Sequence, residues 1–226
     1  MSNWQYIPPT APGSIHLFAE LHGIKGVKPQ KQLEIMPYIV AKTERFEKEE
    51  GNPFMTGESS NVAVGVDAKI GITSDVTLDL TVNPDFGQVE ADPSQVNLTA
   101  FELFFREQRP FFIEGSNTLN FPITDFNSNN LFYSRRIGRS PQGGVDTDES
   151  GEDGVNEYVK AKSKTPILGA AKLTGKNKKG FSWGILESVT NEEKATIDSL
   201  GYRRKQTIEP LTNYLVARAQ QDINKG

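Results

Sequence analysis

Three acidic residues lie close together in a turn-rich stretch, where their side chains could bind a metal ion. Asp85, Glu90 and Asp92 fall within the sequence NPDFGQVEADP, residues 83–93. Carboxylate oxygens at this density suit calcium, although the spacing is not that of an EF-hand loop. A rigid double turn, fixed by the two prolines and the glycine of this stretch, explains the same composition. We favour the turn, and calcium remains the one metal to consider.

A second group of carboxylates, Glu102, Glu107 and Glu114, could supply the acid and base of a glycoside hydrolase. That chemistry depends on the separation of two carboxylates, which the sequence does not give. Arg106 and Arg109 lie close enough in the chain to be ion-pair partners instead. We therefore favour a structural role and predict no catalytic residue. If the chain is an enzyme after all, glycoside hydrolysis is the chemistry to expect.

Arginines cluster further along, at Arg135, Arg136 and Arg139. If this segment is a strand, Arg135 and Arg136 point to opposite faces, and both cannot face lipid. One of them could line a lumen, where arginine favours anions. Together with Arg109 and Glu114, this pair is our candidate set for lumen or ligand contacts. A solvated strand end explains the arginines equally well.

The rest of the composition excludes several classes of site. The absence of cysteine excludes disulfides, thiolate metal ligands and thiol nucleophiles. The two histidines lack metal-binding spacing, and no nucleotide-binding glycine motif or nucleophile elbow occurs. The net charge of −4 offers no basic surface for nucleic acid. We predict no cofactor, apart from the calcium alternative, and no nucleic-acid partner.

The elements that must position these residues are mainly strands, and the clearest signal spans residues 61–83. Apolar side chains occupy every second position from Val62 to Ile72, and small or polar ones lie between them. After a turn at Ser74-Asp75, the alternation resumes. The pattern predicts a β-hairpin with one apolar and one polar face. Each arm suits a tilted membrane-spanning strand of about 9–11 residues better than the roughly 5–6 residues of an average strand.

Weaker patterns complete the expected meander. Pro37 places the strand predicted over 32–44 at an edge or a bulge. A second hairpin is predicted over 166–190, with its turn at 177–180. Further strands are predicted over 111–121, 130–138 and 211–221, and polar loops over 44–58, 140–157 and 191–210.

One short amphipathic helix is predicted over 99–109. Thr99 and Glu102 form a capping box, and Pro110 is placed as the helix stop. Helical spacing then groups several aromatic side chains, which we assign to the core rather than to a ligand platform: Phe101, Phe104, Phe105, Phe111 and Phe112.

Several of these segments together carry a resemblance to a known family. They are residues 83–93, 97–98, 101–102, 104–105, 109–115 and 132–138. They resemble an uncharacterised domain family of Gram-negative surface proteins, whose members usually carry this domain behind a family-nine-type carbohydrate-binding domain. Residues 4–8 resemble the exit from that preceding domain, and residues 106–108 depart from the family pattern. The resemblance implies an outer-membrane-type barrel and brings no catalytic residues.

The expected architecture is all-β, an antiparallel meander forming part of an outer-membrane-type β-barrel. We expect residues 1–14 to be a linker from a missing N-terminal domain and 15–226 to be a partial barrel domain, with a helix-containing insert at about 94–115. The first residues do not form a signal peptide, and no apolar run reaches the roughly 18 residues of a membrane helix. Of the strand patterns above, about six or seven are clear, whereas a membrane barrel needs at least about eight strands. The chain is therefore expected to be a fragment with an exposed sheet edge.

The expected function is that of the N-terminal part of an outer-membrane barrel of a Gram-negative surface protein. We expect an association with carbohydrate binding or uptake and no catalysis by this segment. The partners would be outer-membrane lipid and glycans, the latter bound through the missing domain. The alternatives are a soluble, glycoside hydrolase-like β domain and a scaffold that displays the preceding domain.

Overall fold

The computed structural model describes residues 32–84, 104–122, 130–147 and 157–223, together with Phe18, His22, Gly23 and Gly26. The chain divides into two units, Met1–Gln30 and Lys31–Gly226, and all the strands and helices described below belong to the second. This unit is mostly β. It contains one antiparallel sheet of six strands, another of three strands and one short α-helix.

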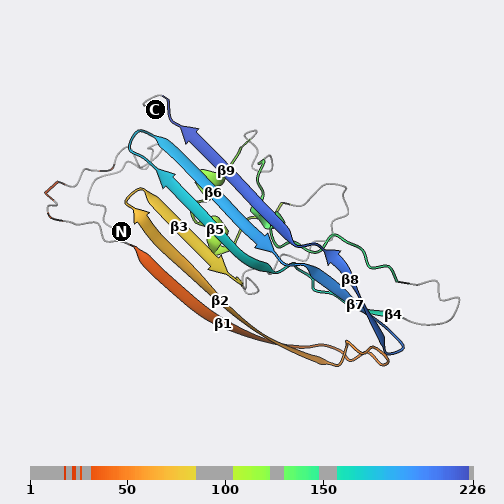
Figure 1. Ribbon diagram of the computed structural model, residues 1–226. Coiled ribbons are helices and arrows are strands. Elements are labelled where there is room, and N and C mark those ends of the chain that lie inside the picture. The colour runs from red at the N-terminus through yellow and green to blue at the C-terminus, as the bar shows by residue number, and fades with distance from the viewer. Residues whose placement is uncertain are drawn as a thin grey trace, which may run out of the picture. The chain divides into compact units, whose positions relative to one another are not determined.

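The six-stranded sheet is a nearly sequential meander (Figure 1). In spatial order its strands are β1 (Leu33–Arg45), β2 (Glu58–Thr73), β3 (Val76–Val82), β5 (Ile167–Lys176), β6 (Phe181–Thr190) and β9 (Thr212–Gln221). The smaller sheet contains β4 (Glu157–Lys160), β7 (Glu193–Ser199) and β8 (Tyr202–Glu209). Neither sheet closes into a barrel within the described residues, and β1 and β9 form the two open edges of the larger one.

The hairpin predicted over 61–83 is confirmed as β2 and β3, the hairpin predicted over 166–190 as β5 and β6, and the strand predicted over 211–221 as β9. The edge position of Pro37 is also confirmed. Gly71 donates its backbone N–H to the carbonyl of Gln32 at 2.7 Å, so β1 bonds to β2 through its even-numbered residues. The backbone nitrogen of Pro37 therefore faces the open edge of the sheet. Its lack of an N–H removes no hydrogen bond between β1 and β2.

The polar loop predicted over 191–210 is wrong, because β7 and β8 form a hairpin there. Ala195 and Ile197 are fully buried, and polar residues alternate with them. The turn between the strands consists of Leu200 and Gly201, both at positive φ. This geometry is that of a type I′ turn, which asparagine and glycine usually occupy. Because leucine is not typical of the first turn position, the turn and its hairpin were not predicted from the sequence.

The helix predicted over 99–109 is wrong in its described part, because residues 104–109 are not helical. The capping-box residues Thr99 and Glu102 lie outside the described residues. The α-helix α1 spans Pro110–Ile113 instead. Proline suits the first position of a helix, because a backbone N–H there would have no intrahelical acceptor and proline lacks that N–H. Pro110 thus begins a helix rather than ending one.

The strands predicted over 111–121 and 130–138 are also wrong. These segments hold α1 and two short 3₁₀ helices, η2 (Ser116–Leu119) and η3 (Ser134–Arg136). Pro122 and Asn130 form an isolated β-bridge between them. Phe111, Phe112, Leu119 and Ile137 pack into the core on the large sheet, so their spacing reflects tertiary contacts rather than a strand period.

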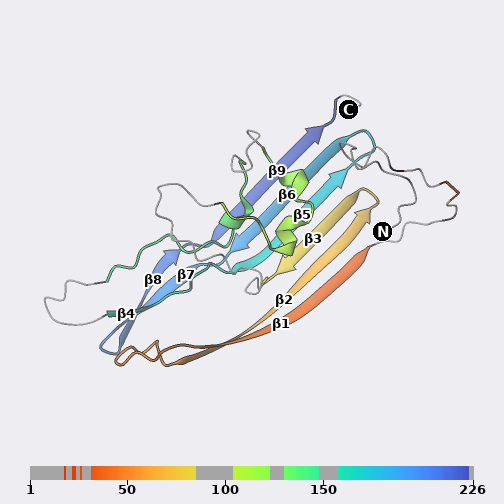
Figure 2. The same ribbon diagram turned by 180° about the vertical axis from the view of Figure 1, so that it is seen from behind.

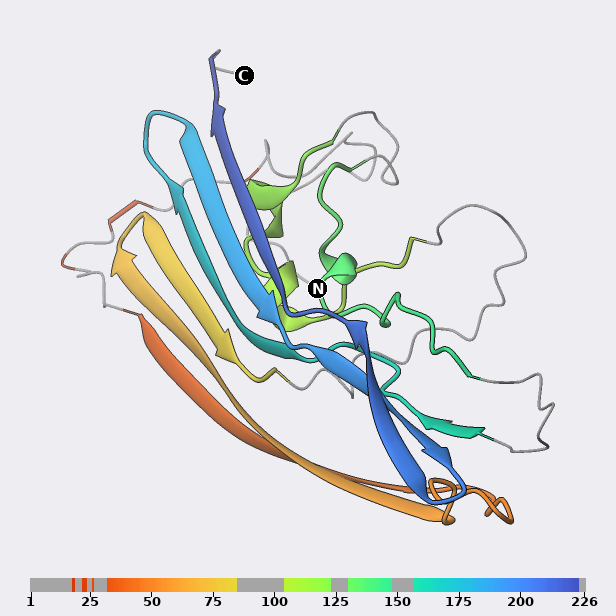
Figure 3. The same cartoon turned by 45° about the vertical axis from the view of Figure 1, so that its right-hand side comes forward.

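We call the described residues 104–122 and 130–147 the insert. From behind, in Figure 2, the insert lies in front of β3, β5 and β6. The sheet is curved, and the insert occupies its concave side (Figure 3). The main core forms where the two meet, and it consists of Phe111, Phe112, Leu119, Ile137, Ile167, Ala170 and Leu186. Among the described helices, none combines the length and hydropathy needed to cross a membrane.

Candidate functional site

The two faces of the six-stranded sheet differ in what they bury. On the inner face, toward the insert, Asp79 is 6% exposed and Thr81 is also buried. On the outer face, Ile39 is 73% exposed and Leu215 is 66% exposed. The strand register places nine large, exposed apolar side chains on this outer face, namely Leu33, Ile35, Ile39, Val62, Val64, Val82, Phe181, Ile185 and Leu215.

A row of alternating charges crosses four neighbouring strands of the inner face. Glu34 on β1 pairs in register with Lys69 on β2, Lys69 with Asp79 on β3, and Asp79 with Lys172 on β5. We call these four residues the charge row. Opposite charges directly across a strand pair stabilise a sheet, and here every neighbouring pair has opposite sign. The row therefore brings charges into the covered face without leaving like charges side by side.

Lys172 is the most deeply buried member of the charge row, at 1% exposure. Its Nζ lies 3.4 Å from Oδ2 of Asp79 and donates to the backbone carbonyls of Phe111 and Glu114, at 2.5 Å each. The ammonium also lies 4.7 Å from the centre of the Phe111 ring. An ammonium has three donor hydrogens, and the carboxylate and two carbonyls supply three acceptors. Lys172 thus fastens α1 to the sheet.

Lys69 reinforces this attachment from the neighbouring strand, because its Nζ forms an ion pair with the Glu114 carboxylate at the end of α1. The other oxygen of the central carboxylate, Oδ1 of Asp79, has no hydrogen-bond partner in the described part of the chain. The charge of Asp79 is therefore compensated mainly by the two lysines beside it. Removing either lysine would leave a buried carboxylate with weaker compensation.

A second buried ionic cluster lies within the insert itself. Arg109, at 2% exposure, donates Nε and Nη2 to the two carboxylate oxygens of Glu107, each at 2.8 Å. Arg109 also donates to the carbonyls of Ile137 (2.7 Å) and Ser134 (2.9 Å), and its guanidinium lies 4.2 Å from the Phe112 ring centre. The two-pronged pairing with Glu107 orients the guanidinium, and its bonds to Ser134 and Ile137 tie this segment to η3. We call Arg109, Glu107 and Ser134 the insert clamp.

The insert clamp also decides how Glu107 is ionised. Burial favours the neutral acid, but the hydrogen bonds and charge of Arg109 and the hydroxyl of Ser134 outweigh it and lower the pKa of Glu107. A general acid in glycoside hydrolysis needs the opposite shift, a raised pKa. Glu114 is engaged by Lys69, and Glu102 lies outside the described residues. The geometry around Glu107 and Glu114 therefore gives no support to a hydrolytic carboxylate pair.

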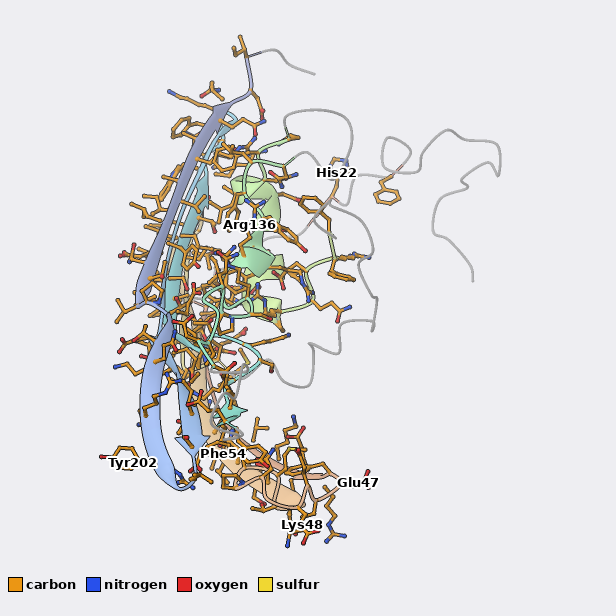
Figure 4. The ribbon with its side chains drawn as sticks, turned by 90° about the vertical axis from the view of Figure 1, so that its right-hand side faces the viewer. His22, Glu47, Lys48, Phe54, Arg136 and Tyr202 are labelled. Carbon is orange, nitrogen blue, oxygen red and sulfur yellow. The ribbon has the colours of Figure 1, made fainter. Side chains whose placement is uncertain are left out.

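The other predicted site residues lie on the insert in different settings. Arg135 and Arg136 belong to η3 and not to a strand, so the expectation that they point to opposite faces of a sheet is wrong. Arg135 donates to the carbonyl of Arg106 at 2.9 Å and lies 5.7 Å from the Phe105 ring centre. Arg136 is exposed (Figure 4). The structure thus places these arginines in a different setting from Arg109, which is buried in the insert clamp.

The proposed calcium ligands, Asp85, Glu90 and Asp92, lie outside the described residues. Among the residues that are described, no group of three or more histidine, cysteine or acidic side chains could hold a metal ion. The candidate site therefore consists of oppositely charged side chains that pair with one another. Its geometry can hold one segment of the chain on another and can present a polar inner surface.

Sequence reasoning missed the charge row. Lys69 was assigned to the polar face of its hairpin, but its partners Asp79 and Lys172 lie on separate strands. One signal was available, because acidic and basic residues occupy polar positions of both predicted hairpins. The strands predicted over 111–121 and 130–138, however, separated these hairpins in the expected meander. The register between β3 and β5 could not be predicted, because 84 positions, 83–166, lie between these strands in the sequence.

Comparison with known proteins gives one match. The model of a family described as Domain of unknown function (DUF5916) matches residues 29–226. No curated protein and no solved structure matches the chain. The matched range contains all nine strands, both ionic clusters and the whole described insert.

Proposed function

The chain belongs to this family of unknown function, DUF5916, and we propose that its six-stranded sheet forms part of the wall of an outer-membrane β-barrel. In this proposal the outer face contacts lipid, and the insert lies on the lumen side as a partial plug. The segment would act as a membrane-embedded part of a surface protein in a Gram-negative bacterium, and it would carry out no catalysis.

The observation that carries the proposal is the uncovered apolar outer face. Nine large apolar side chains are exposed there, whereas single exposed apolar residues are normal on a soluble protein and large contiguous patches are not. A sheet in water usually buries its apolar face and exposes its polar one. The reverse arrangement, with Lys172 and Asp79 buried, is that of a barrel strand with lipid outside and a filled lumen inside.

Strand length and loop length also support the proposal. β5, β6 and β9 each have 10 residues, and β1 and β2 have 13 and 16. A tilted membrane strand needs about 9–11. The connections at one end are short turns, at 74–75 and 177–180, while those at the other end are the long loop 46–57 and the segment 83–166. Membrane barrels show the same asymmetry, with short periplasmic turns and long outer loops.

The proposed link to glycans has a narrower basis. It rests on the resemblance to surface proteins that carry a carbohydrate-binding domain ahead of this one. We therefore place glycan binding or uptake in the protein that carries this segment and not in the charge row or the insert clamp.

Cell fractionation of the native protein, followed by gel migration with and without boiling, tests the membrane assignment. We expect recovery in the outer-membrane fraction and faster migration of the unboiled, folded form. Recovery in the periplasmic or cytosolic fraction, with the same migration before and after boiling, would overturn the proposal. Conductance in a planar bilayer would then distinguish a channel from a plugged wall or an anchor.

A further inference from the structure

A cavity of about 560 Å³ lies away from the charge row, beside the three-stranded sheet. Its walls include Gly51 and Pro53 from the β1–β2 loop, Tyr158 from β4, and Asp198, Leu200 and Arg203 from the β7–β8 hairpin. Small-molecule sites usually occupy about 300–1,000 Å³ and combine apolar walls with a few convergent polar groups. The volume and lining of this cavity match that description.

Arg203 is held in place without using its terminal nitrogens. Its Nε donates to Oδ2 of Asp198 at 3.0 Å, and its guanidinium lies 5.4 Å from the centre of the Phe54 ring. Asp198 is itself fixed, because its Oδ1 accepts the N–H of Gly201 at 2.9 Å. The two terminal nitrogens of Arg203 have no hydrogen-bond partner among the described residues. A positioned guanidinium therefore presents an unused pair of donors beside the cavity.

Tyr158 supplies a second unused polar group on the same cavity. Its hydroxyl lies against Gly51, where an added Cβ would approach it to 3.1 Å, and it has no hydrogen-bond partner in the described part of the chain. The ring of Tyr158, together with Pro53 and Leu200, provides apolar wall. In Figure 4, Phe54 lies between the tip of the β7–β8 hairpin and the β1–β2 loop, whereas Tyr202 points away from it.

The rim of the cavity is strained. Leu200, exposed at the tip of the β7–β8 turn, has a φ of 51°. A leucine in the left-handed region costs on the order of 1–2 kcal/mol relative to its ordinary conformations. Glycine or asparagine would form the same turn without this cost. Leu200 gives the cavity an apolar wall that neither of those residues would provide.

We propose that this cavity binds a small organic carboxylate, with the acid group on the terminal nitrogens of Arg203 and the apolar body against Tyr158, Pro53 and Leu200. A planar guanidinium fork matches the two oxygens of a carboxylate, and the Tyr158 hydroxyl can donate a further hydrogen bond. The cavity lies at the long-loop end of the molecule, but its binding chemistry depends only on the seven lining residues and Phe54. It does not rest on the membrane assignment.

Benzoate and its neutral analogue benzamide provide the test, with binding to the full chain measured by isothermal titration calorimetry. We expect benzoate to bind roughly tenfold or more tightly than benzamide, the factor typical of a charge-assisted hydrogen-bonded pair. Phenyl phosphate, a tetrahedral dianion, should bind more weakly than benzoate. Equal affinity for benzoate and benzamide, tighter binding of phenyl phosphate, or no binding of benzoate would overturn the proposal.

Variants locate the site. Arg203→Gln should abolish the preference for benzoate, and Tyr158→Phe should weaken it several-fold. Lys205→Gln removes the same charge from the same strand outside the cavity and should leave the preference intact. Because Arg203→Gln deprives Asp198 of its partner, Arg203→Lys keeps the charge while removing the planar fork, and it should still lose most of the preference. Equal losses in Arg203→Gln and Lys205→Gln would show a nonspecific charge effect and contradict the assignment.

Discussion

The inner and outer faces of the six-stranded sheet come from the same strands, yet they follow opposite rules. Alternate residues of β3 and β5 place Asp79 and Lys172 on one face and Leu80 and Leu173 on the other. The charged pair is buried, whereas Ile39 on the outer face of β1 is 73% exposed. Strand alternation alone produces two different faces, but it does not determine which of them is covered.

The difference between the faces shows which interactions hold the insert. Phe111, Phe112 and Leu119 give the inner face a small apolar core, but ionic pairs and hydrogen bonds to backbone carbonyls surround it. A buried charge is stabilising only when its partners are complete. The inner face should therefore be sensitive to the loss of single polar groups, and the outer face should be sensitive to the surrounding solvent. Each of the following predictions tests one side of this contrast.

The largest effect is expected at Lys172. Lys172→Met leaves Asp79 buried without its nearest cation and removes two bonds to α1, so we expect the free energy of unfolding to fall by about 3–5 kcal/mol. Chemical unfolding in detergent micelles, followed by tryptophan fluorescence, measures the change. Lys176→Met, at the exposed end of the same strand, is the matched control and should change stability by less than about 0.5 kcal/mol.

The double variant Asp79→Leu with Lys172→Met shows whether the loss comes from an unpaired charge. Replacing both members of a buried ion pair by apolar residues is often neutral or stabilising, so most of the lost stability should return. If the double variant is as unstable as Lys172→Met, the loss of stability does not come from the unpaired Asp79 carboxylate. The inner face would then not be sensitive to the loss of a charge partner.

The outer face should tolerate charge in water but not in lipid. Ile185 lies near the middle of β6 on this face, and Ile185→Lys should cost about 2–4 kcal/mol when the protein is folded into lipid vesicles. Gln221→Lys, at the end of β9 on the same face, should cost only about 0–1 kcal/mol. Unfolding titrations in vesicles measure both. Equal costs at the two depths would indicate that the outer face does not contact a bilayer.

The insert clamp predicts that the free energy of unfolding depends on pH through the ionisation of Glu107, on the covered side of the sheet. Because the folded-state pKa of Glu107 lies below its unfolded-state value of about 4.3, this carboxylate stabilises the fold above that pH and loses its effect as the pH falls through the folded-state pKa. Glu107→Gln should cost about 1–3 kcal/mol at pH 7. The difference between variant and wild type should shrink toward pH 3. A difference that stays constant with pH would contradict the role of the charge.

The strands of the two hairpins and of β9 could be predicted because their signal is local. Alternation over 61–83 and a proline at position 37 depend only on neighbouring residues and on the open edge. The insert could not be predicted in the same way. Phe111 and Phe112 reach the core from the short helix α1, so their spacing follows the surface beneath them and not a period of their own. Pro110 illustrates this, because the same residue can end one helix or begin the next.

The candidate site was predictable only in part. Arg109 and Glu114 were singled out, and both contribute to fastening or filling the inner face. Glu107 was considered as a catalytic acid and proved to be the partner of Arg109. The pairing of Asp79 with Lys172 depends on which strands become neighbours after a long intervening segment. That is a property of the topology, and no short-range pattern carries it.

The smallest effect tests how closely the insert packs on the sheet. A Cβ added at Gly184 on the inner face of β6 would lie 3.0 Å from Cδ2 of Leu119 and 3.1 Å from Cγ2 of Thr118. These contacts are tight but involve side-chain ends that can shift, so Gly184→Ala should cost about 1 kcal/mol, the low end of the range for overpacking. Gly144 has open space at its Cβ position and no positive φ, so Gly144→Ala should be neutral or slightly stabilising in the same unfolding assay. The two positions differ in whether the side chains of another segment lie against the added Cβ. A neutral Gly184→Ala would mean that η2 does not stay on β6, and the inner face would then be open in solution like the outer one.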